Sequence, residues 1–302
     1  MIMKKSWVHL KFNEFVSNRC QPDNPFIHLC TLKGQDMALA HNLGFPRIGR
    51  DHELRARHWQ VQKDAGIKLL PVGDFAWFDQ PFDLSWAQLF DEVAQATALG
   101  HAVKPVVIGP LTYLWQGETN GSVDKLERLD GLLPLYDQHL NRLAAQGVEW
   151  VQIDEPALAE DLPQDWKNAY ERVYNILQRA PLKKLIATYS GGLGGNLGLA
   201  ANLPVDGLHI DLVQAPDQYV TILDRLPAYK VLSLGLVDGV NAAPCNLGHT
   251  LDLLHDAHER LGERLWLAPS CALLHCPQDL AVQKCQEVAV LAAALEQNRA
   301  AA

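Results

Sequence analysis

Short apolar segments alternate with amphipathic segments from about residue 40 to the end of the chain, and this alternation restricts the possible folds more than any other feature. Each of eight strand-like segments is followed by a stretch whose apolar residues have helical spacing. The strand-like segments are almost continuously apolar, as is typical of parallel strands buried on both faces. Eight strand–helix units in strict order predict a single (β/α)8 TIM-type barrel with short loops rather than a doubly wound sheet. The predicted strands cover residues 40–49, 68–75, 104–114, 149–158, 183–190, 206–213, 230–237 and 264–274.

The first 36 residues differ from the rest, because they have no clear periodicity and contain the turn-rich stretch QPDNP. Strong patterning begins immediately after Met37. Two interpretations stay open: residues 1–36 are a short N-terminal arm of the barrel, or they are an upstream extension and Met37 is the natural start. The barrel itself is predicted to span residues 37–302.

The composition excludes several classes of function. A formal charge of -9 over 302 residues argues against general binding of nucleic acid, which needs a basic surface. The chain has six cysteines and no CxxC pair, so a disulfide framework is not expected and a reducing compartment fits better. No apolar run is long enough to span a bilayer, and no apolar run follows the basic N-terminus as in a signal peptide. We therefore expect a cytoplasmic protein.

In a (β/α)8 barrel the chemistry lies where the strands end, so polar residues at strand ends are the candidates for ligand binding. Asp74 follows the second predicted strand, and Asp154 and Glu155 end the fourth, just before Pro156. Neighbouring residues on a strand point to opposite sides, so one of these two carboxylates is expected to face the barrel mouth. The alternative is that both cap backbone groups or pair with Lys or Arg.

Two further groups of side chains are candidates at the same end. Glu160 lies further along the loop that follows the fourth strand, where it could contact a ligand or simply be solvated. His209, Asp211 and Cys271 are residue types that bind zinc, and separate strands of a barrel could bring them together. Their spacing matches no zinc signature, and a free cysteine is commonly a small buried apolar residue.

Several long segments together resemble the N-terminal half of cobalamin-independent methionine synthase. The resemblance runs from about His41 to the C-terminus and is carried by LGFPRIG, ELRARHWQVQKDAGIKLLPVGDFAWFD, KPVVIGPLTYLW, GVEWVQIDEPAL, GLHIDLV and SCALLH. It implies a barrel from a two-barrel enzyme that transfers a methyl group from 5-methyltetrahydropteroyl-polyglutamate to homocysteine. In that family the C-terminal barrel holds a zinc ion, and the N-terminal barrel helps to bind the polyglutamate tail.

Matching this barrel to the catalytic half of the family assigns expected roles to four residues. Asp154 falls on the aspartate that holds homocysteine, and Glu160 falls on a glutamate that contacts the folate. Asp211 and Cys271 fall on an acidic and a cysteine zinc ligand. The histidine and second cysteine expected near ATYSG do not occur, and Val240 and Asn241 stand where the catalytic histidine is expected.

The chain is also shorter than the family pattern after GFPRIG, after DFAWFD and after SCALLHCPQDL, and the residues that the family uses for the folate tail fall in the first two gaps. The resemblance therefore implies homocysteine and methyl-folate as ligands, a possible zinc, and a separate catalytic barrel as a possible partner. The chain could be a complementing half, a compact stand-alone methyltransferase, a degraded relic, or a binding barrel without turnover.

Overall fold

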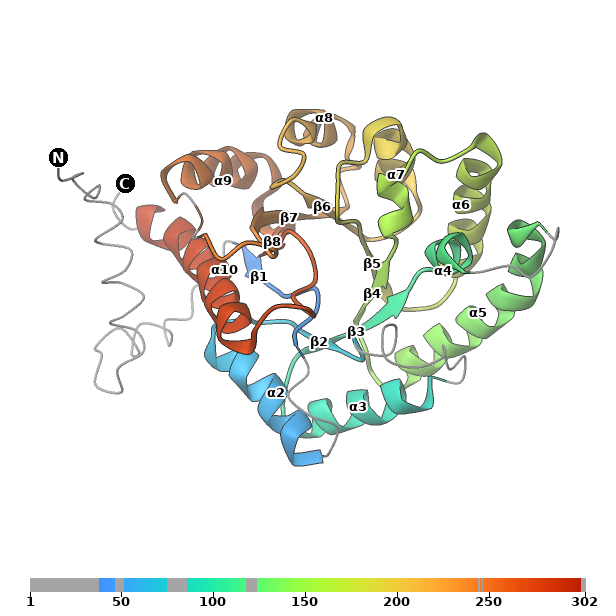
Figure 1. Cartoon of the computed structure of the whole chain (residues 1–302), viewed down its shortest axis with the longest axis horizontal. Coiled ribbons are helices and arrows are strands. Elements are labelled where there is room, and N and C mark those ends of the chain that lie inside the picture. Colours follow the sequence, from blue (N-terminus) through green and yellow to red (C-terminus); the bar gives the residue numbers. More distant parts are fainter. Residues whose placement is uncertain are drawn as a thin grey trace. The chain divides into compact units, whose positions relative to one another are not determined.

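The computed structural model describes residues 38–46, 52–74, 86–117, 124–243, 245 and 247–299, and these form eight strands with helices between them (Figure 1). The strands are β1 (Leu39–Ala40), β2 (Leu70–Val72), β3 (Val103–Ile108), β4 (Trp150–Asp154), β5 (Lys183–Ala187), β6 (Gly207–Asp211), β7 (Val231–Val237) and β8 (Leu265–Pro269). The α-helices are α2 (His52–Asp64), α3 (Ala87–Ala98), α4 (Pro110–Gln116), α5 (Leu129–Ala145), α6 (Gln164–Leu177), α7 (Leu197–Asn202), α8 (Gln218–Arg225), α9 (Leu247–Leu261) and α10 (Gln278–Arg299). The expectations for residues 1–36 lie outside the described residues.

The strands are all parallel and follow one another around the sheet in chain order, with β1 next to β8. The ring closes between β1 and β2 through a single parallel bridge, His41 with Leu69, and through the Lys68 N–H, which donates to the Ala40 carbonyl at 2.9 Å. The predicted TIM-type barrel is therefore confirmed. The first strand is shorter than its sequence suggested, so the ring has a thin seam between β1 and β2.

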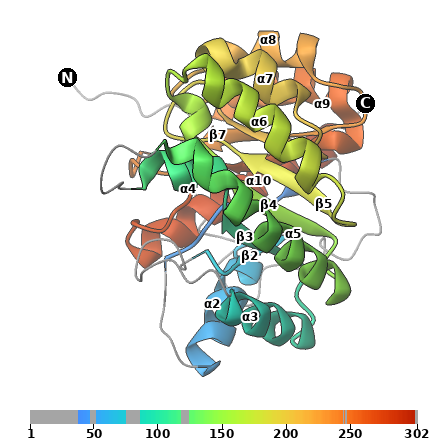
Figure 2. The same cartoon turned by 90° about the vertical axis from the view of Figure 1, so that its right-hand side faces the viewer.

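The helices surround the strands, as the two views at right angles show (Figures 1 and 2). Glycines at positive φ follow the ends of α3 and α5: Gly100 has φ 77° and Gly147 has φ 85°. None of the helices in the described part of the chain is both long and apolar enough to cross a membrane.

The apolar core is divided by the strands. One large cluster fills the space between the strands and the surrounding helices, from Ala38 to Leu295. Inside the ring, Trp150, Leu185 and Trp266 form a small apolar floor where the strands begin, and the two indole rings lie 4.6 Å apart. Above this floor the interior becomes polar, which is unusual because barrel interiors are commonly filled by branched apolar side chains.

Candidate functional site

The end of β4 separates the two adjacent carboxylates, as strand alternation predicted. Asp154 points into the ring, where its Oδ1 accepts a hydrogen bond from Gln152 Nε2 at 2.6 Å and its Oδ2 accepts one from the Tyr189 hydroxyl at 3.1 Å. Only 6% of Asp154 is exposed. No ion pair within the described residues reaches this carboxylate directly. Asp154 is therefore a buried inward-facing acid held by neutral donors.

Glu155 faces the opposite way, into the helix layer, and is fully buried. Its carboxylate accepts hydrogen bonds from Thr112 N at 2.8 Å, Thr112 Oγ1 at 2.6 Å, Tyr170 Oη at 3.0 Å and Tyr174 Oη at 2.9 Å, and a longer one from Leu111 N at 3.4 Å. These donors occupy both oxygens, and the Glu155 carboxylate thereby caps the first turn of α4. The geometry thus places Glu155 as a cap of backbone and hydroxyl groups, which the sequence had left open as the alternative to ligand contact.

Gly109 makes this capping possible. A Cβ built on Gly109 would lie 1.9 Å from the carboxyl carbon of Glu155, which no real contact allows. The absence of a side chain at position 109 therefore lets the Glu155 carboxylate approach the N-terminus of α4.

Lys104 enters the ring from β3 and is also fully buried. Its Nζ donates to the Asn42 carbonyl at 3.3 Å and to Gln152 Oε1. Gln152 Nε2 in turn donates to Asp154, and also to the Leu43 carbonyl at 3.0 Å. Lys104, Gln152 and Asp154 therefore form a continuous chain of hydrogen bonds across β3 and β4.

Asp74 follows β2 at the same end of the ring and is 1% exposed. Its Oδ2 accepts a hydrogen bond from Phe45 N at 2.7 Å, whereas its Oδ1 is buried and has no hydrogen-bond partner. An unpaired buried carboxylate oxygen costs free energy unless a ligand or water satisfies it. Of the residues predicted to bind substrate, Asp74 and Asp154 are thus the two placed inside the ring.

Burial is the largest cause of the pKa shifts of Asp74, Asp154 and Lys104. Desolvation raises the pKa of Asp74 to about 7, opposed by the hydrogen bond from Phe45. Desolvation also raises the pKa of Asp154 and lowers the pKa of Lys104, and the attraction between these two groups opposes both shifts. Lys104 is attracted by Asp74 as well. Asp154 and Lys104 therefore titrate together, while Asp74 attracts Lys104 more weakly.

His209 does not offer a free ring nitrogen to a metal ion. Its Nδ1 lies 2.8 Å from Ser233 Oγ, and its Nε2 lies 3.5 Å from the Ser270 carbonyl. His41 Nε2 contacts the same Ser233 hydroxyl at 2.7 Å. Desolvation lowers the pKa of both imidazoles, that of His209 to about 3, so both rings are neutral at pH 7.

The other predicted zinc ligands do not join His209. Asp211 Oδ1 accepts hydrogen bonds from Val213 N at 2.9 Å and Gln214 N at 3.0 Å, which closes the turn after β6. Burial is the largest cause that raises the pKa of the Cys271 thiol, to about 11. The described residues contain no group of three or more His, Cys, Asp or Glu side chains placed to hold a metal ion. The expected zinc set therefore does not fit this structure.

Glu160 ends the short 3-10 helix Pro156–Ala159 after β4, and its side chain is exposed to solvent. The structure thus separates Glu160, which is solvated, from Asp154, which is buried within the ring.

Sequence reasoning missed Lys104, Gln152, His41 and Ser233. A signal for two of them was present: Gln152 lies two residues before Asp154 on a strand, so both share the inner face, and Lys104 is a charged residue inside an otherwise apolar strand. A charge at such a position predicts an inward-facing polar group.

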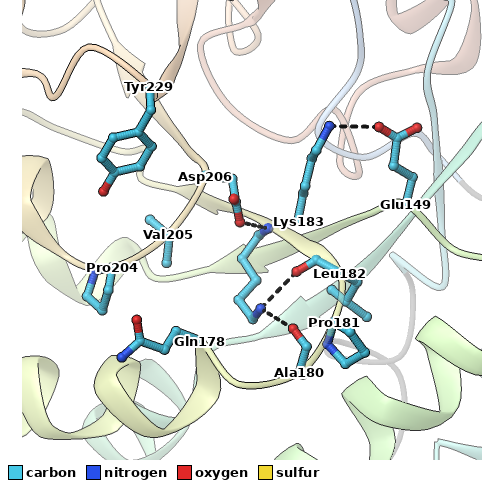
Figure 3. Close-up of a pocket in the computed structure, with 11 residues that line it drawn as sticks. Glu149, Gln178, Ala180, Pro181, Leu182, Lys183, Pro204, Val205, Asp206 and Tyr229 are labelled. Carbon is cyan, nitrogen blue, oxygen red and sulfur yellow. Dashed lines mark hydrogen bonds and ion pairs between the residues drawn. The ribbon is translucent and has the colours of Figure 1, made fainter.

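A hollow of about 490 Å³ lies at the opposite end of the barrel, where the strands begin (Figure 3). Its charged groups already have partners: Lys183 Nζ contacts Glu149 at 2.9 Å, and Asp206 accepts a hydrogen bond from the backbone N–H of Lys184 at 2.8 Å. The Lys184 ammonium donates to the carbonyls of Ala180 and Leu182. Because these groups satisfy one another, we place the functional site at the Asp154 end.

Comparison with known proteins gives consistent results. The sequence profile of the cobalamin-independent synthase N-terminal domain matches residues 80–262. The fold is similar to a B12-independent methionine synthase from Shewanella sp. W3-18-1 in complex with selenomethionine, with a TM-score of 0.68 and 13% identity over 88% of this chain and 99% of that chain.

Two further solved structures share the fold. One, from Listeria monocytogenes, is assigned as a vitamin-B12-independent methionine synthase (TM-score 0.65, 17% identity, 87% of this chain and 99% of that chain). The other is a methyltransferase from Methanosarcina mazei (TM-score 0.62, 13% identity, 95% of this chain and 99% of that chain). At these identities the structural matches establish the fold.

Proposed function

Because the chain belongs to the family of the cobalamin-independent synthase N-terminal domain, we propose that its barrel mouth binds the amino acid of the methionine synthase reaction. The ligand would be homocysteine before methyl transfer and methionine after it. Asp154 would receive the α-ammonium group, and Asp74 would supply a second acceptor through its free oxygen. The barrel would serve methyl transfer from 5-methyltetrahydropteroyl-polyglutamate to the homocysteine sulfur.

The proposal rests mainly on one observation, that Asp154 is buried without a direct ion pair within the described part of the chain. A carboxylate that is nearly fully buried and has no direct ion pair among the described residues is costly to keep. An ammonium group that binds there would satisfy this charge with a charge-assisted hydrogen bond. Asp74 Oδ1, buried and without a partner, provides a second reason to place a donor group in the mouth.

The comparisons support the choice of ligand. The Shewanella protein, which shares the fold, is described in complex with selenomethionine, an analogue of methionine. This chain covers 99% of that protein and of the Listeria protein, so single barrels of this kind occur among the similar structures. These similarities support an amino-acid site in a single barrel.

Methyl transfer would break the bond between the folate nitrogen and its methyl group and form a bond from that methyl to sulfur, while the thiol loses its proton. Thiol activation is commonly supplied by a metal ion. The residues expected to hold zinc do not fit it, so no step of the proposal depends on zinc bound to Cys271, Asp211 or His209. We propose that this barrel binds the amino acid while a separate catalytic barrel supplies thiol activation.

A second candidate is a binding barrel without turnover, and it is favoured by the same lack of a metal-ligand group among the described residues. Both candidates predict that L-methionine and L-homocysteine bind to the purified protein in calorimetry. Formation of methionine from homocysteine and methyl-folate, assayed with and without a catalytic methionine synthase barrel and alongside zinc content, separates the two. If neither amino acid binds, both candidates fail.

A further inference from the structure

The polar interior of the ring, above the floor of Trp150, Leu185 and Trp266, contains ionisable groups that the proposed ligand contact does not use. Lys104 is fully buried, and the ionisable groups around it come from four different segments: Asp154 on β4, Asp74 after β2, His41 after β1 and His209 on β6. Burial lowers the pKa of both histidines and of Lys104, and only Lys104 is drawn back toward its charged form by the carboxylates of Asp154 and Asp74. A buried amine of this kind costs more free energy than an apolar side chain of similar size.

The hydrogen bonds show how Lys104 acts on Asp154. The Lys104 ammonium has donors only, so Gln152 must turn its Oε1 toward it. That orientation turns Gln152 Nε2 toward Asp154 Oδ1 and the Leu43 carbonyl. Without the ammonium, Gln152 Oε1 would lose its charged donor, and the hydrogen bond from Nε2 to Asp154 would lose the polarisation that this donor supplies.

We propose that Lys104 is a positioning residue for the ligand site. It donates to the Gln152 amide that in turn donates to Asp154, and it supplies the positive charge between Asp154 and Asp74. Both carboxylates can then be ionised when a cationic amino group enters the barrel mouth. The inference rests on the proposed function only for the identity of the ligand, because the effect of Lys104 on Asp154 exists without one.

The test measures the ionisation of Asp154 directly. Protein labelled with ¹³C at the aspartate carboxyl carbons is titrated by NMR, and the Asp154 signal is identified by its loss in Asp154→Asn. In Lys104→Met the Asp154 titration midpoint is expected to rise by at least about one pH unit, because the attraction and the hydrogen bond that favour the ionised form are both weakened. Binding of L-methionine at pH 7 is expected to weaken about tenfold per unit of that rise.

Lys184→Met is the matched control. Lys184 is a buried lysine on the neighbouring strand β5, but its ammonium donates to Ala180 O at 2.9 Å and Leu182 O at 2.8 Å at the other end of the barrel. This variant is expected to leave the Asp154 midpoint unchanged. Gln152→Met keeps the Lys104 charge but removes the amide that donates to Asp154, so it is expected to raise the midpoint on its own account. If Lys104→Met does not fold, Lys104→Gln, which removes the charge but keeps a hydrogen-bond donor, is the deciding variant.

The outcomes separate the two proposals. An unchanged Asp154 midpoint in Lys104→Met, or an equal rise in Lys184→Met, overturns the role of Lys104. If Lys104→Met does not fold, an unchanged midpoint in Lys104→Gln overturns it. A raised midpoint in a protein that binds no methionine at any pH supports the role of Lys104 and overturns the proposed function.

Discussion

At the scale of single residues, Asp154 and Glu155 show how one pair of neighbours acquires two unrelated roles. Strand alternation predicted that they face opposite sides. It could not predict which of them the helices would cover, because this depends on Thr112, Tyr170 and Tyr174, which come from two other helices. The alternative interpretation, in which a carboxylate caps backbone groups, is realised by Glu155 alone.

Asp154→Asn should weaken binding of L-methionine by at least about tenfold, since the amide removes the charge that attracts the ammonium group. The melting temperature should not fall, because the Tyr189 hydroxyl can rotate to accept from the new NH₂ group while Gln152 still donates to the remaining oxygen. Calorimetry and thermal unfolding measure the two effects. A variant that unfolds would show instead that Asp154 is structural.

Glu155→Gln, in contrast, should destabilise the fold. One of the two oxygens becomes an NH₂ group that faces donors, so we expect the free energy of unfolding to fall by about 2–4 kcal/mol. Unfolding in urea measures the loss. An unchanged stability with lost methionine binding would restore the substrate role for Glu155.

Asp74→Asn should change how stability depends on pH. The pKa of Asp74 is raised from 3.8 to about 7 in the folded protein, so between these values the folded state binds more protons than the unfolded state, and the free energy of unfolding falls as pH rises. Removing the carboxyl should leave stability similar at pH 4 and raise it at pH 8 by an amount on the order of a few kcal/mol. Urea unfolding at pH 4, 6 and 8 checks this, and an equal slope in both proteins would contradict it.

At the scale of elements, the contact between α4 and the end of β4 depends on a missing side chain. Gly109→Ala should lower the free energy of unfolding by about 2 kcal/mol or more, because the new methyl group would overlap the Glu155 carboxyl group. Gly131→Ala in α5 is the matched control, since a Cβ there meets nothing within 4 Å, and it should stabilise the helix by about 0.5–1 kcal/mol. Equal effects of the two substitutions in urea unfolding would refute the steric explanation.

The elements were largely predictable from sequence, and the interior of the ring was not. Apolar periodicity and the glycines at 100 and 147 define where strands and helices lie, because these are local signals. The chain of contacts through Lys104, Gln152 and Asp154 depends on the register between β3 and β4, which pairs Val106 with Gln152 and is set by the whole ring.

At the scale of the described barrel, the seam between β1 and β2 is the place where neighbouring strands share the fewest backbone contacts. One bridge and the hydrogen bond from Lys68 N to Ala40 O close the ring there, whereas β6 and β7 pair over five residues. The Lys68 amide should therefore exchange with solvent deuterons faster than the amides of β6 and β7 under native conditions. Hydrogen exchange followed by NMR measures this order, and equal protection would show that the seam opens only with the whole fold.

The polar layer above the Trp150 and Trp266 floor has a consequence for how this sequence can change over evolutionary time. Because an apolar interior would be more stable, mutations at positions 104, 152 and 154 are under two opposed pressures: stability favours their loss, and ligand binding favours their retention. A lineage in which the mouth no longer binds anything would drift toward apolar residues at these three positions. The residues found there in related sequences are therefore a record of whether the site has remained in use.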